Sequence, residues 1–270
     1  MTSPRLFAVA SSTFFAIAGF CSAQNIPGNL SFSVEGSFSN AVSESNSSVL
    51  VTDNNLANGY ASGFDLKDAP AGMTSSGPVG SAGFQWGKAS ANSSYAHSSA
   101  LWFAPTTVTN VSPEQVFKIA DLYYRNGTIV SNTGATAVDL SLKLTFANGS
   151  GLSAVTSVFN MVLENTVNSN DPVASADIVR LGNTSSPLTF TDASGNTYYL
   201  NLYFRPDADT LGNTLSTADE FRVYEGTQGK AELWGQFSTT PAPSPVPEPS
   251  AALLGGMASL LLLRRRVVRN

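Results

Sequence analysis

Cysteine and histidine are almost missing from this 270-residue chain, which has one of each, Cys21 and His97. A single cysteine allows no disulfide within the chain, so the fold must depend on its hydrophobic core. Zinc and redox-metal sites draw on several Cys or His side chains, and we therefore expect no such metal site. His97 lies in a serine-rich stretch, and we interpret it as a surface loop residue.

Signatures of nucleophilic catalysis are missing as well. The chain has no G-x-S-x-G turn, and its single histidine in a serine-rich loop is poor support for a Ser-His-Asp triad. We predict that the protein is not an enzyme and has no catalytic residue. A glycoside-active enzyme stays open as the weakest alternative, because the separation of two catalytic carboxylates is set in space and leaves no sequence motif.

Charged residues are scarce: Asp, Glu, Lys and Arg make up 12% of the chain, against about 25% in an average protein. This composition excludes coiled coils and other long-helix classes. The 14 Lys and Arg stand against 19 Asp and Glu, which gives a net charge of −5. No basic face is available to neutralise phosphate groups, so we expect no nucleic-acid partner.

Residues 1–23 have the pattern of a secretory signal peptide. Arg5 precedes an apolar run over 6–20, and small residues then lead to Ala23. This order predicts export through the inner membrane, with signal peptidase cleaving between Ala23 and Gln24. Cleavage there also removes Cys21, so the mature chain is expected to contain no cysteine.

Three short segments of different composition follow one another over residues 241–270. Residues 241–249 have a proline at every second position, which forces an extended spacer. The apolar run over 250–263 would form a helix of about 21 Å, short of a hydrocarbon core of about 30 Å, so we predict a short transmembrane helix that anchors the chain transiently. Residues 264–270 form an arginine-rich cytoplasmic tail, in which the expected membrane stop is Arg264, Arg265, Arg266 and Arg269.

Together, the tripeptide Pro247, Glu248 and Pro249, the apolar run and the arginine cluster resemble the PEP-CTERM sorting signal. The resemblance implies a Gram-negative bacterium that makes extracellular polysaccharide. It also implies that exosortase, an integral-membrane cysteine transpeptidase, recognises the tripeptide and removes the tail. The expected destination is the cell surface or the extracellular matrix.

Residues 24–240 alternate in hydrophobicity with a period of two, and no stretch has a sustained helical period. The clearest strand pattern spans 137–147, and a second one spans 198–205. Further apolar sets that we expect to face inward are Phe159, Met161 and Leu163, Phe221 with Val223, and Leu233 with Phe237. Two N-terminal strands are expected over 30–38 and 49–52. Short strands separated by turn signals such as Asn126-Gly127 predict an all-β fold, an antiparallel β-sandwich of jelly-roll type.

From about residue 82 the order of motifs resembles the choice-of-anchor K domain family, named for the alternative surface anchors of its members. The segments that carry the resemblance are 84–87, 117–129, 138–146, 165–168, 171–172, 176–179, 195–200 and 221–225. Residues 24–80 match less well. The family implies no defined activity and no catalytic residue.

Two kinds of ligand stay open as alternatives. Calcium ligands could come from Asn168, Ser169, Asn170 and Asp171 with Asp177, or from Asp207 and Asp209, but neither group matches an EF-hand and we interpret both as solvated turn residues. An aromatic platform for carbohydrate could come from Trp86, Trp102, Trp234, Tyr123, Tyr124, Tyr199 and Tyr203. Aromatics that alternate in strands more often lie in the core or pair across strands, so we predict no cofactor and no metal.

The expected protein is thus an exported, exosortase-sorted module of the cell surface or matrix with a structural or adhesive role. Without Arg5, the four C-terminal arginines and Glu248, the net charge of residues 24–240 falls to −9, which suits an extracellular module. The main alternative is a carbohydrate-binding module, with or without calcium, that engages the secreted polysaccharide.

Overall fold

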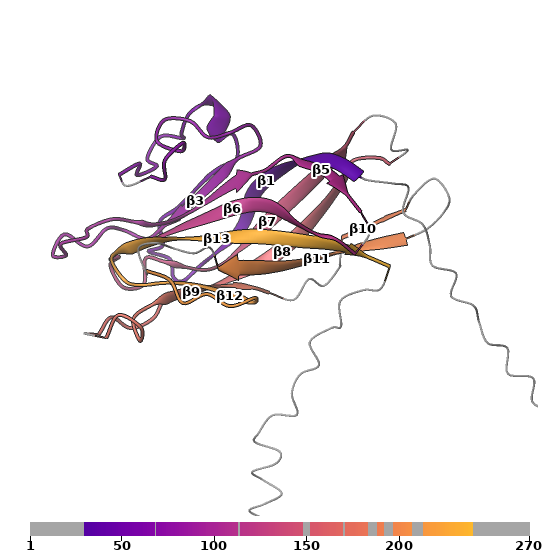
Figure 1. The fold of residues 1–270 in the computed structure, drawn as a ribbon. Coiled ribbons are helices and arrows are strands. Elements are labelled where there is room, and N and C mark those ends of the chain that lie inside the picture. Colours follow the sequence, from indigo (N-terminus) through magenta and orange to yellow (C-terminus); the bar gives the residue numbers. More distant parts are fainter. Residues whose placement is uncertain are drawn as a thin grey trace, which may run out of the picture.

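The computed structural model describes residues 30–67, 69–112, 114–147, 152–169, 171–182, 188–191, 197–206 and 213–239. Within these ranges the one helical element is a single 3-10 turn, η1 (Leu56–Asn58), and the rest of the regular structure is strand. The strands form two antiparallel sheets packed face to face (Figure 1). This confirms the predicted all-β antiparallel sandwich.

The first sheet has the strand order β12-β9-β8-β7-β1-β5. Its strands are β1 (Leu30–Ser43), β5 (Val108–Val111), β7 (Ala135–Phe146), β8 (Val155–Glu164), β9 (Asp177–Leu181) and β12 (Glu220–Val223). The long strands β1, β7 and β8 form its centre. Every pairing in this sheet is antiparallel.

The second sheet has the strand order β10-β11-β13-β6-β4-β3-β2. Its strands are β2 (Leu50–Asp53), β3 (Ala82–Trp86), β4 (Ser99–Pro105), β6 (Val116–Asn126), β10 (Leu188–Thr191), β11 (Thr197–Pro206) and β13 (Thr227–Ser238). β13 lies between β6 and β11 (Figure 1). β6 ends at Asn126, where the Asn-Gly turn signal lies.

The strand patterns expected from the sequence are confirmed where the structure describes them. In β7 the apolar set over 138–146 is buried while the residues between its members are more exposed. β1 and β2 are the two expected N-terminal strands, although β1 continues past residue 38 to Ser43. The predicted inward-facing sets in β8, β12 and β13 are also buried.

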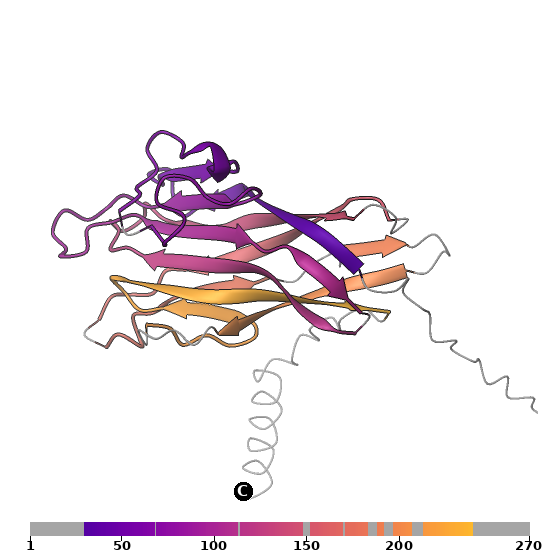
Figure 2. The same ribbon diagram turned by 45° about the horizontal axis from the view of Figure 1, so that its top comes forward.

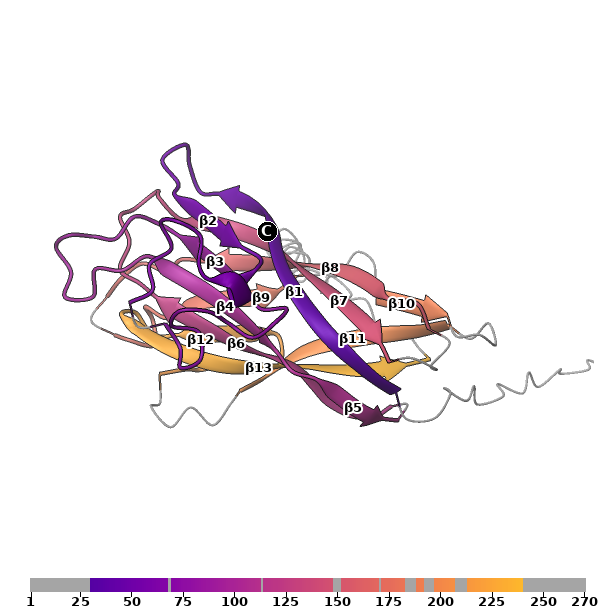
Figure 3. The ribbon, with the colours of Figure 1, turned by 90° about the horizontal axis from the view of Figure 1, so that it is seen from above.

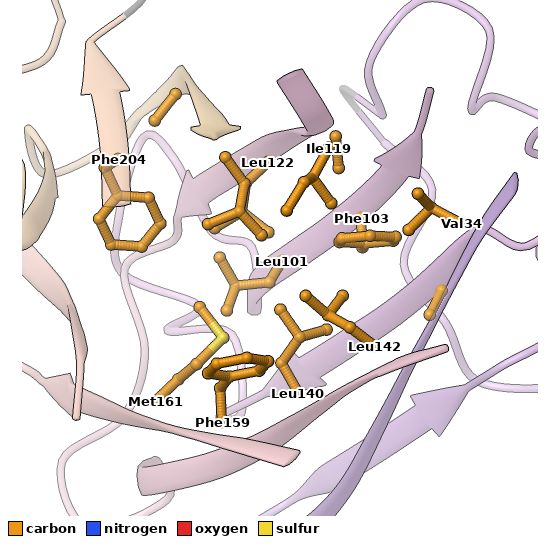
Figure 4. Packing of buried hydrophobic residues seen from close by; sticks show 14 of the residues in the cluster. Val34, Leu101, Phe103, Ile119, Leu122, Leu140, Leu142, Phe159, Met161 and Phe204 are labelled. Carbon is orange, nitrogen blue, oxygen red and sulfur yellow. The ribbon is translucent and has the colours of Figure 1, made fainter. Parts of the chain in front are cut away.

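The core lies between the two sheets and is built from these inward-facing side chains. Leu101 and Leu122 of the second sheet pack toward Leu140, Phe159 and Met161 of the first (Figure 4). All five are at most 2% exposed. Burying a side chain of this size contributes about 1.5–3 kcal/mol to folding, so this layer supplies the stability that disulfides supply in many small exported domains.

Residues 54–67 and 69–79, between β2 and β3, fold over the outer face of β3 and β4 (Figure 3). We call this stretch the covering segment. Leu56, Phe64 and Met73 from it pack with Ala100 and Trp102 in a second, smaller apolar cluster. This half of the second sheet is therefore buried on both faces.

The first and last strands meet at one end of the sandwich (Figure 2). Leu30 pairs with Val111, the Phe32 and Phe237 rings have centroids 5.6 Å apart, and the backbone N–H of Glu114 donates to the carbonyl of Phe237 at 3.1 Å. We call this end, with Leu30 and Ser238, the terminal end. The opposite, distal end carries the loop residues 44–49, 87–98, 127–134, 165–169, 171–176 and 224–226.

Candidate functional site

The sorting residues expected from the sequence lie outside the described residues. They are Ala23 and Gln24 at the signal-peptide cleavage site, Pro247, Glu248 and Pro249 in the tripeptide, and Arg264, Arg265, Arg266 and Arg269 in the tail. In the part of the chain that the structure describes, no helix has the length and hydrophobicity needed to cross a membrane. The sites that can be built from geometry therefore lie on the sandwich itself.

Three aromatic side chains lie half-buried on the outer face of the second sheet, beyond the covering segment. They are Tyr199 and Tyr203 of β11 and Trp234 of β13. Tyr203 and Trp234 are direct cross-strand partners, which places both rings on the same side of the sheet. The guanidinium of Arg205 lies 4.9 Å from the centre of the Trp234 ring. We call this surface the aromatic face.

Hydrogen-bonding groups surround these rings. The indole N–H of Trp234 donates to Oε2 of Glu232 at 2.8 Å, and Lys118 contacts Oε1 of Glu232 at the same distance. Lys118 also pairs with Asp121 at 2.7 Å. Burial alone would lower the pKa of Lys118, but its hydrogen bonds to Asp121 and Glu232 raise it above the usual value, so the lysine stays charged. The face thus combines exposed ring surface with fixed donors and acceptors.

Of the other aromatics proposed for a platform, Trp86, Trp102 and Tyr124 are buried and Tyr123 is half-buried. Trp86 and Tyr124 lie in the core between the sheets, with ring centroids 5.6 Å apart. Trp102 faces outward from β4, but the covering segment leaves it 0% exposed, and Tyr123 packs beside the same cluster. The core interpretation is therefore confirmed for Trp86, Trp102 and Tyr124.

His97 is 7% exposed, so the prediction that it lies on the surface is wrong. Its Nδ1 lies 3.0 Å from Oδ2 of Asp65, and its ring packs edge-on against Tyr95 with centroids 4.8 Å apart. The covering segment brings Asp65 to this loop from 32 positions away in the chain. The serine-rich sequence around His97 has no feature that predicts its contact with Asp65.

Arg125 of β6 completes this cluster and is 0% exposed. Its Nε donates to the carbonyl of Ser98 at 2.9 Å, and its Nη1 donates to the carbonyls of Asp65 and Lys67 in the covering segment. Burial would raise the pKa of Asp65, but the hydrogen bond to His97 and the Arg125 charge together hold it below the usual value. The cluster locks the covering segment onto the sheet, which is a structural role.

At the distal end, the loop considered for calcium is organised by its own side chains. Oδ1 of Asp171 accepts hydrogen bonds from the backbone N–H groups of Val173 and Ala174, at 2.9 and 3.4 Å, as in a capped turn. Ser169 bonds to Ser175 in the same loop. The turn interpretation is confirmed for Asp171, while Asn170, Asp207 and Asp209 lie outside the described residues.

The interpretation of Asp177 as a solvated turn residue is wrong, because this residue is buried and only 5% exposed. Its Oδ1 accepts hydrogen bonds from the backbone N–H and the hydroxyl of Thr166, at 2.7 and 3.1 Å. Burial raises the pKa of Asp177 to about 7, and the negative charge of Glu225 adds to the shift. Glu225 itself has a raised pKa because it is partly buried. The sequence gives no signal for Glu225, which neither set of candidate ligands included.

A shallow groove of about 390 Å³ lies on the outer face of the first sheet, next to the covering segment. Glu35 and Lys143 line it and form an ion pair at 2.9 Å. Ser37, Ser141 and Thr156 contribute hydroxyl groups. These charges are already paired and half-exposed, so the groove offers polar surface but no uncompensated group.

No protein-family model and no curated protein matches this chain. Within the described ranges, no group of three or more His, Cys, Asp or Glu side chains could hold a metal ion. The features of this chain that bear on function are therefore the sorting pattern, the aromatic face and the distal end.

Proposed function

We propose that the chain is an exported protein of a Gram-negative bacterium that exosortase sorts to the cell surface or extracellular matrix, where the sandwich has a structural or adhesive role. The observation that carries the proposal is the order of the spacer over 241–249, the apolar run over 250–263 and the arginine cluster over 264–270, in a chain with a signal-peptide pattern at residues 1–23. Signal peptidase and exosortase are the proposed processing partners. The signal peptide, the transmembrane helix and the jelly-roll topology belong to this proposal.

The layout of the sandwich supports a surface role. The first and last strands meet at the terminal end, so a tether leaving there keeps the distal loops away from the anchor. A core of large apolar side chains also suits an exported domain without disulfides, because such a domain must be stable without cross-links.

Intact mass of the protein from the surface and medium of the native bacterium tests the proposal. We expect a chain that starts at Gln24 and ends near Pro247–Pro249. The variant Glu248→Ala should fold but keep residues 250–270, while Pro243→Ala, in the same spacer but outside the tripeptide, should be processed normally. Processing of Glu248→Ala at the wild-type rate would refute sorting through the tripeptide.

A carbohydrate-binding role is the second candidate, and the aromatic face favours it. A sugar ring offers an apolar C–H surface and a rim of hydroxyls, which fits the half-buried Trp234 and Tyr203 rings beside the polar groups of Arg205 and Glu232. The ligand would be the polysaccharide that the cell secretes.

Binding of that polysaccharide to the processed protein tests this second candidate. Trp234→Ala should weaken binding at least tenfold, because it removes the ring that the sugar would stack on. Val162→Ala, at a 39% exposed position on the first sheet, should leave binding unchanged. Equal binding by wild type and Trp234→Ala would exclude the aromatic face as the binding surface.

A further inference from the structure

Two carboxylates lie close together at the distal end. Asp177 is the first residue of β9, and its cross-strand partner in β12 is Val223. Glu225 follows Val223 by two positions, in the turn that leads to β13. None of the ion pairs among the described residues includes either carboxylate. Two partly or fully buried acidic groups therefore share this end without a neutralising Lys, Arg or His from the described part of the chain.

The side-chain oxygen of Asn126, at the same end, lacks a hydrogen-bond partner among the described residues. Asn126, the last residue of β6, is 0% exposed, and its Nδ2 donates to the carbonyl of Val223 at 3.0 Å. Its backbone carbonyl accepts a hydrogen bond from the N–H of Gly226 at 2.9 Å. Asn126 thus contacts the cross-strand partner of Asp177 through its side chain and the turn of Glu225 through its backbone. Its Oδ1 is buried and makes no hydrogen bond to the described residues, and a bound water or ion would satisfy it.

The carboxylates also keep oxygens available. Among the described residues, Oδ2 of Asp177 has only a long contact, 3.4 Å, with the hydroxyl of Tyr124. Oε1 of Glu225 accepts hydrogen bonds from Thr128 and Asn168 at 2.7 and 3.0 Å, while its Oε2 makes none to the described residues. Each side chain therefore has one oxygen without a strong partner.

We propose that this end of the sandwich binds one Ca²⁺ ion through Asp177, Glu225 and the Oδ1 of Asn126. Ca²⁺ takes six to eight oxygen ligands, from carboxylates, amide carbonyls and water, in flexible geometry. The site contains no nitrogen or sulfur ligand, which disfavours zinc and copper. Water supplies the remaining ligands, because Glu225 lies in a turn that is only partly buried.

The electrostatics agree with a cation. Burial and the nearby Glu225 charge favour the protonated form of Asp177, and burial favours the protonated form of Glu225. A divalent cation reverses both preferences, because it stabilises each carboxylate in its ionised form. The ion would also link the two sheets. The start of β9 and the turn after β12 belong to the first sheet, and the end of β6 belongs to the second. This inference does not depend on the sorting proposal or on the aromatic face.

Thermal unfolding of the full chain in EDTA and in CaCl₂ at pH 7.5 tests the site. We expect CaCl₂ at one hundred times the dissociation constant to raise the Tm by about 5–10 °C. Elemental analysis after dialysis should find one calcium per chain.

Variants assign the ion to these residues. Asp177→Asn and Glu225→Gln keep the size of each side chain and remove its charge, so both should fold in EDTA and lose at least tenfold in calcium affinity. Asn126→Leu removes the amide oxygen and should weaken calcium binding. Asp171→Asn, in the adjacent capped turn, is the matched control and should keep the wild-type response.

Two results would overturn the proposal. One is an unchanged Tm in up to 10 mM CaCl₂ together with no calcium in the elemental analysis. The other is calcium binding that Asp177→Asn and Glu225→Gln leave intact, which would place the ion elsewhere in the chain.

Discussion

The guanidinium of Arg125 lies 5.2 Å from the centre of the Trp102 ring on the neighbouring strand β4, and both side chains are 0% exposed. A positive charge at this depth is stable only if it is paired and hydrogen-bonded. Asp65 and the carbonyl groups of Ser98 and Lys67 satisfy that condition. The covering segment and the buried arginine therefore depend on each other.

Arg125→Met should lower the free energy of unfolding by about 3–5 kcal/mol, because it leaves the carbonyls of the covering segment without donors and Asp65 without its cation. Urea unfolding measures the loss, and limited proteolysis should show earlier cleavage within residues 54–79. Lys143→Met, which breaks a half-exposed ion pair with Glu35, should change stability by less than about 1 kcal/mol. A similar small effect for Arg125→Met would show that the covering segment stays in place without the arginine.

Stability in EDTA should fall as the pH rises from about 4 to 7. Asp177 has a pKa of about 7 when folded and an ordinary value of 3.8, so in this range the native state holds a proton that the unfolded state has released. The loss is on the order of 4 kcal/mol and is complete above pH 7. The folded state lowers the pKa of Asp65, so this group reduces stability as the pH falls. That effect lies below about pH 4, outside this range.

Urea unfolding at several pH values measures this slope, and Asp177→Asn should flatten it. The asparagine carries no charge at any pH, so the variant should match the wild type near pH 4 and exceed its stability near pH 8. A wild-type slope that survives in Asp177→Asn would assign the effect to another group, with Glu225 the next to test.

Gly36→Ala should destabilise the sandwich by about 1–3 kcal/mol, as overpacking does in a filled core. A Cβ at position 36 of β1 would lie 2.3 Å from the Phe103 ring of the opposite sheet, so the ring would have to move. Thermal unfolding measures the effect. Ser37→Ala, next to it on the outer face of β1, should have the stability of the wild type within about 0.5 kcal/mol.

Alternation of apolar residues was enough to predict β7, β11 and the inward-facing sets of β8, β12 and β13, but not the remaining strands of the two sheets. In β7 it placed Val138 and Leu140 inward, because the side-chain period of a strand depends only on local geometry. The same rule places Trp102 and Trp234 on the outer face of the second sheet. It does not reveal that residues 54–79 cover Trp102 and leave Trp234 accessible, since that difference depends on a contact distant in sequence.

The candidate sites were less predictable for the same reason. Asp65 meets His97 and Arg125 across 32 and 60 positions of sequence, and the contacts form only after the covering segment folds back. Asp177 stands close to a polar turn in the sequence, but the fold buries it against Thr166 and Tyr124. In the sequence, Asn126 is part of an Asn-Gly turn signal. In the fold, its side chain is buried and hydrogen-bonded to Val223 of β12.

The position of β13 has a mechanical consequence. β13 is hydrogen-bonded to β6 on one side and β11 on the other, and it ends at the terminal end. When the distal end is held by a bound partner, a pull on the chain beyond Ser238 acts along this strand. Both ladders are then loaded in shear, with many hydrogen bonds sharing the force at once, so the domain should resist rupture under flow better than one whose last strand peels away from an edge.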